Sequence, residues 1–284
     1  MKIALMDSGI GLLAAAAVVR RLHPEADLVL SSDPDTMPWG PQSPEQISEL
    51  ALAAAEAAAA HRPDALIVAC NTASVHALPA LRARLEPGLP VIGTVPAIKP
   101  AAADGGPVAI WATPATTGSP YQRGLIEEFA GGVSVTEVPC PGLADAVQEA
   151  DEDAITRTVE AAAALTPPDV RAVVLGCTHY ELVAERIRAA VQQPDRPPLV
   201  LYGSAGAVVA QALRRVRERG AVSAQDPAPA APERTGGTGT TARSTGTEGT
   251  LTVLLGGHEA PLPRAAHIYA EGRLLAASDP VLKP

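Results

Sequence analysis

The chain has 284 residues, of which 47% are hydrophobic and only 2% aromatic, so it can form a large, mainly aliphatic core. Its net charge of −9, with no basic face visible, argues against binding to nucleic acids. The three cysteines are too few and too widely spaced for a disulfide framework, and they favour a reducing compartment. We see neither a signal peptide nor a membrane-spanning segment, and therefore expect a soluble cytoplasmic protein.

Short apolar runs alternate with longer stretches rich in Ala, Glu and Arg, which predicts parallel strands covered by helices. The apolar runs are continuous, as in strands that are buried on both faces. The expected strands are 2–6, 27–31, 65–69, 90–93, 108–112, 133–138, 171–176, 198–202 and 251–255. The expected helices are 11–22, 43–61, 74–85, 119–130, 142–164, 180–192 and 204–219.

An internal repeat divides this series into two. Residues 65–70 read ALIVAC and residues 172–177 read AVVLGC, so each is an apolar strand that ends on a cysteine. Polar residues follow both cysteines, and the neighbouring strands also correspond. We therefore expect two similar, doubly wound α/β domains with parallel sheets, related by pseudo-symmetry, and an active site in the cleft between them.

The repeat also suggests domain boundaries. We place the first half at 1–96, completed by 204–221 and 251–284, and the second half at 97–203. Residues 222–250 are rich in Pro, Gly and Thr and show no periodicity, which predicts a disordered insert.

Ligands of open α/β sheets bind beyond the carboxyl ends of the strands, where this chain concentrates its polar residues. Cys70 and Cys177 hold matching positions there and would face each other across the shared cleft. A thiolate can take a proton from one face of an α-carbon while a thiol delivers one to the other, which inverts the carbon. Asp7 and His179 are the candidate helpers of Cys70 and Cys177, respectively. Donors for a substrate carboxylate would be Asn71, Thr72, Thr113, Thr116 and Thr178.

Structural explanations compete with these roles. A cysteine at a strand end is often a small buried hydrophobe, and Asp, Asn and Thr at such positions can cap helices. Cys140 lies between two prolines without a counterpart in the repeat, so we interpret it as structural. The histidines lack metal-ligand spacing, and Gly9-Ile10-Gly11 lacks the third glycine of a dinucleotide fingerprint, so we interpret it as a tight turn. We expect neither a metal nor a cofactor.

The motifs IALMDSGIG, MPWG, ACNTAS, PVIGTVPA and LGCTHYEL strongly resemble those of the glutamate racemases, in the same order, from residue 3 to about residue 205. The resemblance implies cofactor-free interconversion of L- and D-glutamate, which supplies D-glutamate for peptidoglycan. It implies that Cys70 acts on the D-glutamate side and Cys177 on the L-glutamate side, and that the protein forms a homodimer. The substrate-binding pairs that it implies are Asp7-Ser8, Trp39-Gly40, Asn71-Thr72 and Thr178-His179.

The chain departs from the family pattern at three places. Trp39 replaces the usual Tyr, and Tyr180-Glu181 replaces Tyr-Pro. Gln148, with Glu149 next to it, stands where the family has a Glu that assists catalysis. Three alternatives therefore stay open: a racemase or isomerase of a related acid such as aspartate or a hydantoin, a ligand-binding paralogue with weak or no activity, and a nucleotide-binding regulator. The missing phosphate loop weakens the last of these.

Overall fold

The computed structural model describes residues 1–225 and 249–277, and the insert predicted at 222–250 lies outside them apart from its two ends. The first sheet has six strands in the order β10-β9-β2-β1-β3-β4. All neighbouring strands are parallel except β10, which pairs antiparallel with β9. The strands are β1 (Lys2–Asp7), β2 (Asp27–Ser32), β3 (Ala65–Val68), β4 (Val91–Gly93), β9 (Leu251–Leu255) and β10 (His258–Glu259).

The second sheet repeats this topology. Its four parallel strands follow the order β6-β5-β7-β8, which matches β2-β1-β3-β4 of the first sheet. They are β5 (Val108–Ala112), β6 (Val135–Pro139), β7 (Ala172–Leu175) and β8 (Val200–Tyr202). The predicted pair of similar α/β halves with parallel sheets is therefore confirmed. Only β10 departs from the parallel arrangement among the described strands.

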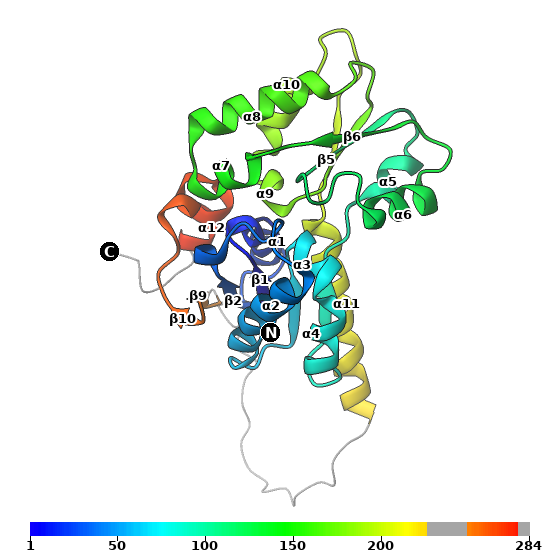
Figure 1. Ribbon diagram of the computed structural model, residues 1–284. Helices are drawn as coiled ribbons and strands as arrows, with labels where there is room; N and C mark the ends of the chain where they lie inside the picture. Colours follow the sequence, from blue (N-terminus) through cyan, green and yellow to red (C-terminus); the bar gives the residue numbers. More distant parts are fainter. Residues whose placement is uncertain (226–248, 278–284) are drawn as a thin grey trace, which may run out of the picture.

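Helices cover both sheets, and each half forms one lobe in Figure 1. Those near the first sheet are α1 (Leu13–Leu22), α2 (Pro44–Ala59), α3 (Asn71–His76), α4 (Leu78–Leu85) and α11 (Ala205–Gln225). Those of the second half are α5 (Ile98–Ala103), α6 (Pro120–Phe129), α7 (Leu143–Glu149), α8 (Glu152–Leu165), α9 (Thr178–Glu181) and α10 (Ala184–Val191). Near the junction, α12 (Ala270–Ala277) packs on α1. Short 3-10 helices are η1 (Ile10–Leu12), η2 (Pro34–Thr36) and η3 (Arg264–Ile268).

Several helices differ from the sequence-based expectation. The segment expected as one helix at 142–164 is two, because Ala150 takes a left-handed conformation with φ 55 and ends α7. Asp151 then begins α8, since its Oδ1 accepts a hydrogen bond from the Ala154 amide at 2.9 Å. The helix expected at 204–219 continues to Gln225, and α5 and α12 were not predicted. Residues 10–12 form a 3-10 turn rather than a simple tight turn.

The core is aliphatic, as the composition predicts. β3 and β7 are buried along their whole length, and alanines of α1 and α2 allow these helices to pack closely. One cluster of buried apolar side chains extends from the first half into the second, which holds the two halves in a common core. Among the described residues, no helix is both long and apolar enough to cross a bilayer.

Candidate active site

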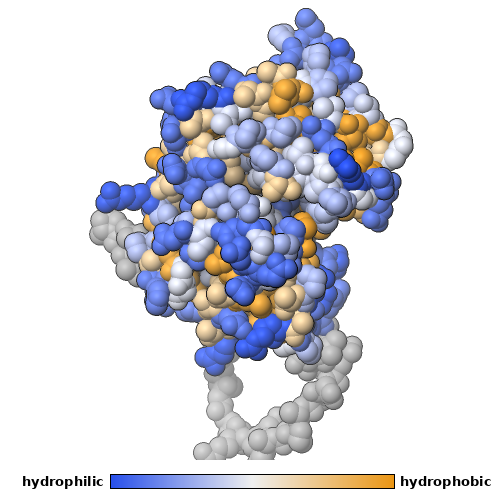
Figure 2. All heavy atoms as spheres, in the orientation of Figure 1, coloured by the Kyte–Doolittle hydropathy of each residue, from blue (hydrophilic) through white to orange (hydrophobic). Residues whose placement is uncertain are grey.

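A cavity of about 430 Å³ lies between the two halves. Its wall is made of residues that follow the carboxyl ends of β1, β2 and β3 in the first half and of β5, β6 and β7 in the second. The surface view in Figure 2 shows an indentation at the junction of the two lobes. The cavity therefore occupies the position at which an open α/β sheet binds its ligands.

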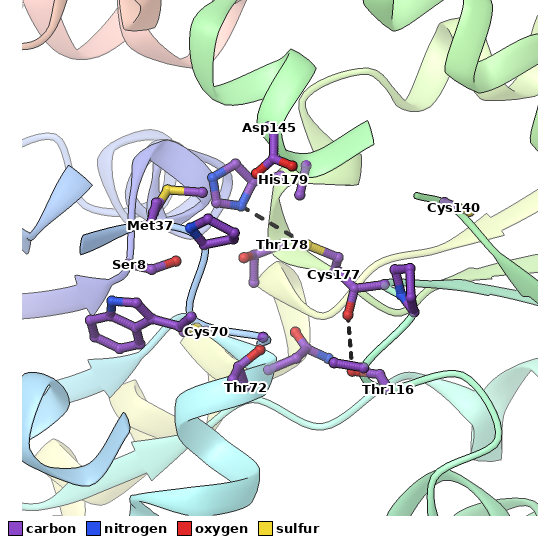
Figure 3. Close-up of a pocket in the computed structure, with 18 of the residues that line it drawn as sticks. Ser8, Met37, Cys70, Thr72, Thr116, Cys140, Asp145, Cys177, Thr178 and His179 are labelled. Carbon is purple, nitrogen blue, oxygen red and sulfur yellow. Dashed lines mark hydrogen bonds between the residues drawn. The ribbon is translucent and has the colours of Figure 1, made fainter. Parts of the chain in front are cut away.

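Every site residue proposed from the sequence lines this cavity. Figure 3 shows the positions of several of these side chains. They are Asp7, Ser8, Trp39, Gly40, Cys70, Asn71, Thr72, Thr113, Thr116, Cys177, Thr178 and His179. Sequence reasoning missed Met37 and Asp145, which also line it, although both lie in loops or helix starts that follow a strand. Cys140, which we interpreted as structural, is buried but also forms part of the wall.

Cys70 lies two residues beyond the end of β3 and is the N-cap residue of α3. Its thiol interacts with the carboxyl group of Asp7, the last residue of β1. Oδ1 of Asp7 accepts hydrogen bonds from the Ser8 amide at 2.7 Å and the Ser8 hydroxyl at 3.3 Å. Complete burial raises the pKa of Asp7 from 3.8 to about 7, so at neutral pH this carboxyl can either accept or give a proton.

Cys177 holds the equivalent position after β7, and its Sγ lies 3.9 Å from Nδ1 of His179. Burial raises the pKa of Cys177 to about 12, and burial together with the charge of Asp7 raises the pKa of Cys70 well above its usual value. Burial also lowers the pKa of His179 to about 4, so this imidazole is neutral at neutral pH. Each thiol thus needs a nearby proton acceptor to become a thiolate. Asp7 lies beside Cys70, and His179 lies beside Cys177.

Gln148, rather than Glu149, reaches the site. Its Oε1 accepts a hydrogen bond from the Ile10 amide at 2.8 Å and lies 3.1 Å from Nε2 of His179. Glu149 is exposed at the end of α7. A neutral amide therefore stands beside His179, and it joins the second half to the first through Ile10.

The cavity offers neutral donors for an anionic ligand. Both polar atoms of the Asn71 side chain are buried without a hydrogen-bond partner among the described residues, which leaves them available to a ligand. Thr113 and Thr116 lie with their hydroxyls 3.3 Å apart on the same wall. The indole Nε1 of Trp39 already donates to Thr36 at 2.9 Å. No lysine or arginine appears among the described residues that line the cavity, so carboxylates would depend on hydroxyl, amide and backbone N–H groups.

No group of His, Cys, Asp and Glu side chains within residues 1–225 and 249–277 has an arrangement that could hold a metal ion. The chemistry that these residues themselves can perform is proton transfer. Cys70 and Cys177 reach the cavity from different halves, and each has an acid–base partner beside it. Such a site suits an enzyme that moves protons on two sides of one small molecule.

Comparisons with known proteins agree with this class of enzyme. Residues 12–212 match the family described as Asp/Glu/Hydantoin racemase. The glutamate racemase of Roseiflexus sp. (strain RS-1) is 36% identical over 223 residues, which cover 77% of this chain and 80% of that protein. The glutamate racemase of Granulibacter bethesdensis is 37% identical over 237 residues, covering 81% and 83% of the two chains.

Solved structures agree as well. The crystal structure of Escherichia coli glutamate racemase, in complex with L-glutamate and the activator UDP-MurNAc-Ala, superimposes with a TM-score of 0.70 and 26% identity. The superposition covers 97% of this chain and 92% of that one. The chain belongs to the Asp/Glu/hydantoin racemase family, and it is a racemase by that membership.

Proposed function

We propose that this chain is a glutamate racemase that interconverts L- and D-glutamate without a cofactor by using two cysteines. Relatives that are 36% and 37% identical to it over the aligned residues carry that name, and the similar Escherichia coli enzyme was solved with L-glutamate. The observation that carries the proposal is the pair of cavity-lining thiols, each beside its own proton acceptor.

Racemisation from L- to D-glutamate begins with the thiolate of Cys177, which removes the α-proton on its side of the substrate. The Cys70 thiol then delivers its proton to the opposite face of the carbanion, and the C–H bond is restored with inverted configuration. In the reverse direction Cys70 is the base and Cys177 the acid. Asp7 and His179 take up or return the thiol protons, because the unaided pKa values of the buried cysteines are too high.

The α-proton of an amino acid is weakly acidic, so the site must stabilise negative charge that develops on the α-carboxylate. We assign this task to Asn71, whose amide is buried and otherwise unpaired, together with the hydroxyls of Thr72, Thr113 and Thr116. Ser8 and the backbone at Trp39-Gly40 lie on the first-half side of the cavity and would hold the side-chain carboxylate.

The biological setting follows from the same family resemblance. We propose that the enzyme supplies D-glutamate for peptidoglycan and thereby supports cell-wall biogenesis and cell shape. We also propose that it acts in the cytoplasm as a homodimer. We also propose that its domains are residues 1–96, completed by 204–221 and 251–284, and residues 97–203. The small acidic substrate, rather than a nucleic acid or membrane, is the expected partner of this acidic chain.

The direct test is incubation of the purified protein with L-glutamate in deuterium oxide. Proton NMR should show loss of the α-proton signal, and chiral chromatography should show D-glutamate that carries α-deuterium. Cys70→Ser and Cys177→Ser should each lose racemisation, whereas Cys140→Ser should retain it. Parallel incubation with L-aspartate distinguishes the related-acid alternative. If both serine variants racemise as fast as the wild type, the two-thiol mechanism is wrong.

A further inference from the structure

The proposed two-thiol chemistry leaves the enzyme in a different protonation state after each turnover. When L-glutamate becomes D-glutamate, Cys177 has gained a proton and Cys70 has lost one. Before the next L-glutamate can react, one proton must move from Cys177 to Cys70. The path of that proton, which rests on the proposed function, must connect the two thiols.

Two buried side chains connect the thiols. The carboxyl group of Asp7 interacts with the Cys70 thiol, and Oδ2 of Asp7 lies 4.0 Å from Nδ1 of His179. The same Nδ1 lies 3.9 Å from Sγ of Cys177. One nitrogen atom therefore faces both the carboxyl group of the first half and the thiol of the second. Thr178 adds a hydrogen bond from its hydroxyl to Oδ2 of Asp7 at 3.4 Å, which holds the carboxyl group in this direction.

Gln148 determines which nitrogen of His179 can accept a proton. The Ile10 amide can only donate, so the atom of Gln148 that it contacts at 2.8 Å must be the carbonyl oxygen. That oxygen lies 3.1 Å from Nε2 of His179, and two acceptors would repel, so Nε2 carries the hydrogen. In a neutral imidazole the lone pair then belongs to Nδ1, which is the atom between Asp7 and Cys177.

Gly11 provides the space for this arrangement. A methyl group at Gly11 would overlap Oδ2 of Asp7 and Oγ1 of Thr178, and it would lie 2.7 Å from Nδ1 of His179. No larger residue fits while these groups keep their positions. Asp7 and His179 are 0% and 2% exposed, so bulk water has little access to the connection.

We propose that Asp7 and His179 form an internal proton relay that returns one proton from Cys177 to Cys70 after each L-to-D turnover, and in the opposite direction after each D-to-L turnover. The Asp7 carboxylic acid gives its proton to the Cys70 thiolate. Nδ1 of His179 takes the proton from the Cys177 thiol and passes it to the Asp7 carboxylate. The net change is one S–H bond broken at Cys177 and one formed at Cys70, with no other reactant consumed.

The relay predicts a particular kinetic signature. The parameter kcat/KM reports reaction of free enzyme whose two protonation forms have equilibrated, whereas kcat at saturating glutamate includes the return of the proton. In Gly11→Ala, a methyl group separates Asp7 from His179. In Gln148→Leu, the neutral imidazole is free to place its hydrogen on Nδ1. Both variants should lose at least about tenfold in kcat and clearly less in kcat/KM, which also falls to some extent because His179 is the proton acceptor of Cys177 in the chemical step.

Gly124→Ala is the matched control for the glycine substitution, because a methyl group at this exposed position of α6 meets no atom within 4 Å. Circular dichroism and thermal unfolding show whether each variant is folded. Should Gly11→Ala fail to fold, Gln148→Leu gives the decision. Equal losses in kcat and kcat/KM would indicate a distorted site and overturn the relay, as would folded variants with unchanged kcat.

A tracer experiment tests the wild type directly. An equilibrium mixture of carbon-14-labelled L- and D-glutamate receives a large excess of unlabelled L-glutamate. Slow return of the proton would drive label transiently from D- to L-glutamate, so the wild type and Gly124→Ala should show no transient and the two relay variants should show one. A transient in the wild type overturns the relay alone. A wild type that exchanges no α-proton overturns the proposed function and the relay together.

Discussion

Replacement of Asp7 by asparagine is expected to stabilise the folded chain at alkaline pH while it removes activity. Burial raises the pKa of Asp7 from 3.8 to about 7, so the folded state binds this proton more tightly than the unfolded state does. Stability therefore falls as pH rises through the window from 3.8 to about 7 and stays reduced above it. At about 1.4 kcal/mol for each tenfold change in proton affinity, the ionised carboxyl costs about 4 kcal/mol.

Asparagine avoids that cost because it carries no charge. Its oxygen can still accept the hydrogen bond from the Ser8 amide, which is 2.7 Å long in the wild type. The NH2 group of asparagine, which replaces the second carboxylate oxygen, forms less favourable hydrogen bonds and reduces the net gain. We therefore expect the free energy of unfolding to rise by about 2–4 kcal/mol at pH 9. Near pH 4, where the wild-type carboxyl is protonated in the folded state and still partly protonated in the unfolded state, the gain should be small.

Urea unfolding of Asp7→Asn and wild type, followed by circular dichroism at pH 4, 7 and 9, measures this gain. Asp195→Asn, at an exposed loop position, is the control and should change the unfolding free energy by less than about 0.5 kcal/mol. A gain of the same size at every pH would show that packing, not charge, is responsible. An Asp7→Asn chain that is no more stable than wild type at pH 9 would refute the reasoning.

Three further substitutions have defined outcomes. Gln148→Glu places a carboxylate beside Nε2 of His179 and should raise the pKa of that imidazole from about 4 by more than about one pH unit, as measured by NMR titration; an unchanged value would contradict the contact. Glu181→Ala removes the carboxylate that accepts hydrogen bonds from Ser204 and from the Ala205 amide at the start of α11, so urea unfolding should show a loss of about 1–2 kcal/mol. Ala150→Gly relieves the strain of the left-handed conformation with φ 55, so it should raise the free energy of unfolding by up to about 1 kcal/mol and with it the melting temperature. A lower melting temperature would contradict the assigned strain.

The two similar α/β halves could be predicted from the sequence because the repeat involves the most buried strands. ALIVAC and AVVLGC are continuous apolar runs, so they had to occupy sheet centres, and the cysteines had to lie at the carboxyl ends. The strand order β2-β1-β3-β4, repeated as β6-β5-β7-β8, was not predicted, because an apolar run does not show which strands are its neighbours. β10 escaped prediction, because a two-residue antiparallel strand leaves no periodic pattern.

The surroundings of the thiols were harder to predict. The sequence could not decide between Gln148 and Glu149, because that choice depends on the helical phase of α7 and on where α7 ends at Ala150. Neighbouring positions on a helix point about 100° apart, so only one of the two can face His179. The direction of Nδ1 in His179 also could not be read from residue types, since it depends on the Ile10 amide in the other half of the molecule.

The placement of β9 has a consequence for synthesis on the ribosome. Leu28 in β2 pairs with Leu251 in β9, so the outer edge of β2 is covered by a segment that the ribosome makes long after β2 itself. Until then the nascent chain exposes the unpaired backbone of an apolar strand, which is a template for association with other chains. The second half, whose sheet uses only residues 108–202, can finish its own sheet earlier. Premature termination before residue 251 should therefore release an aggregation-prone product rather than a smaller folded enzyme.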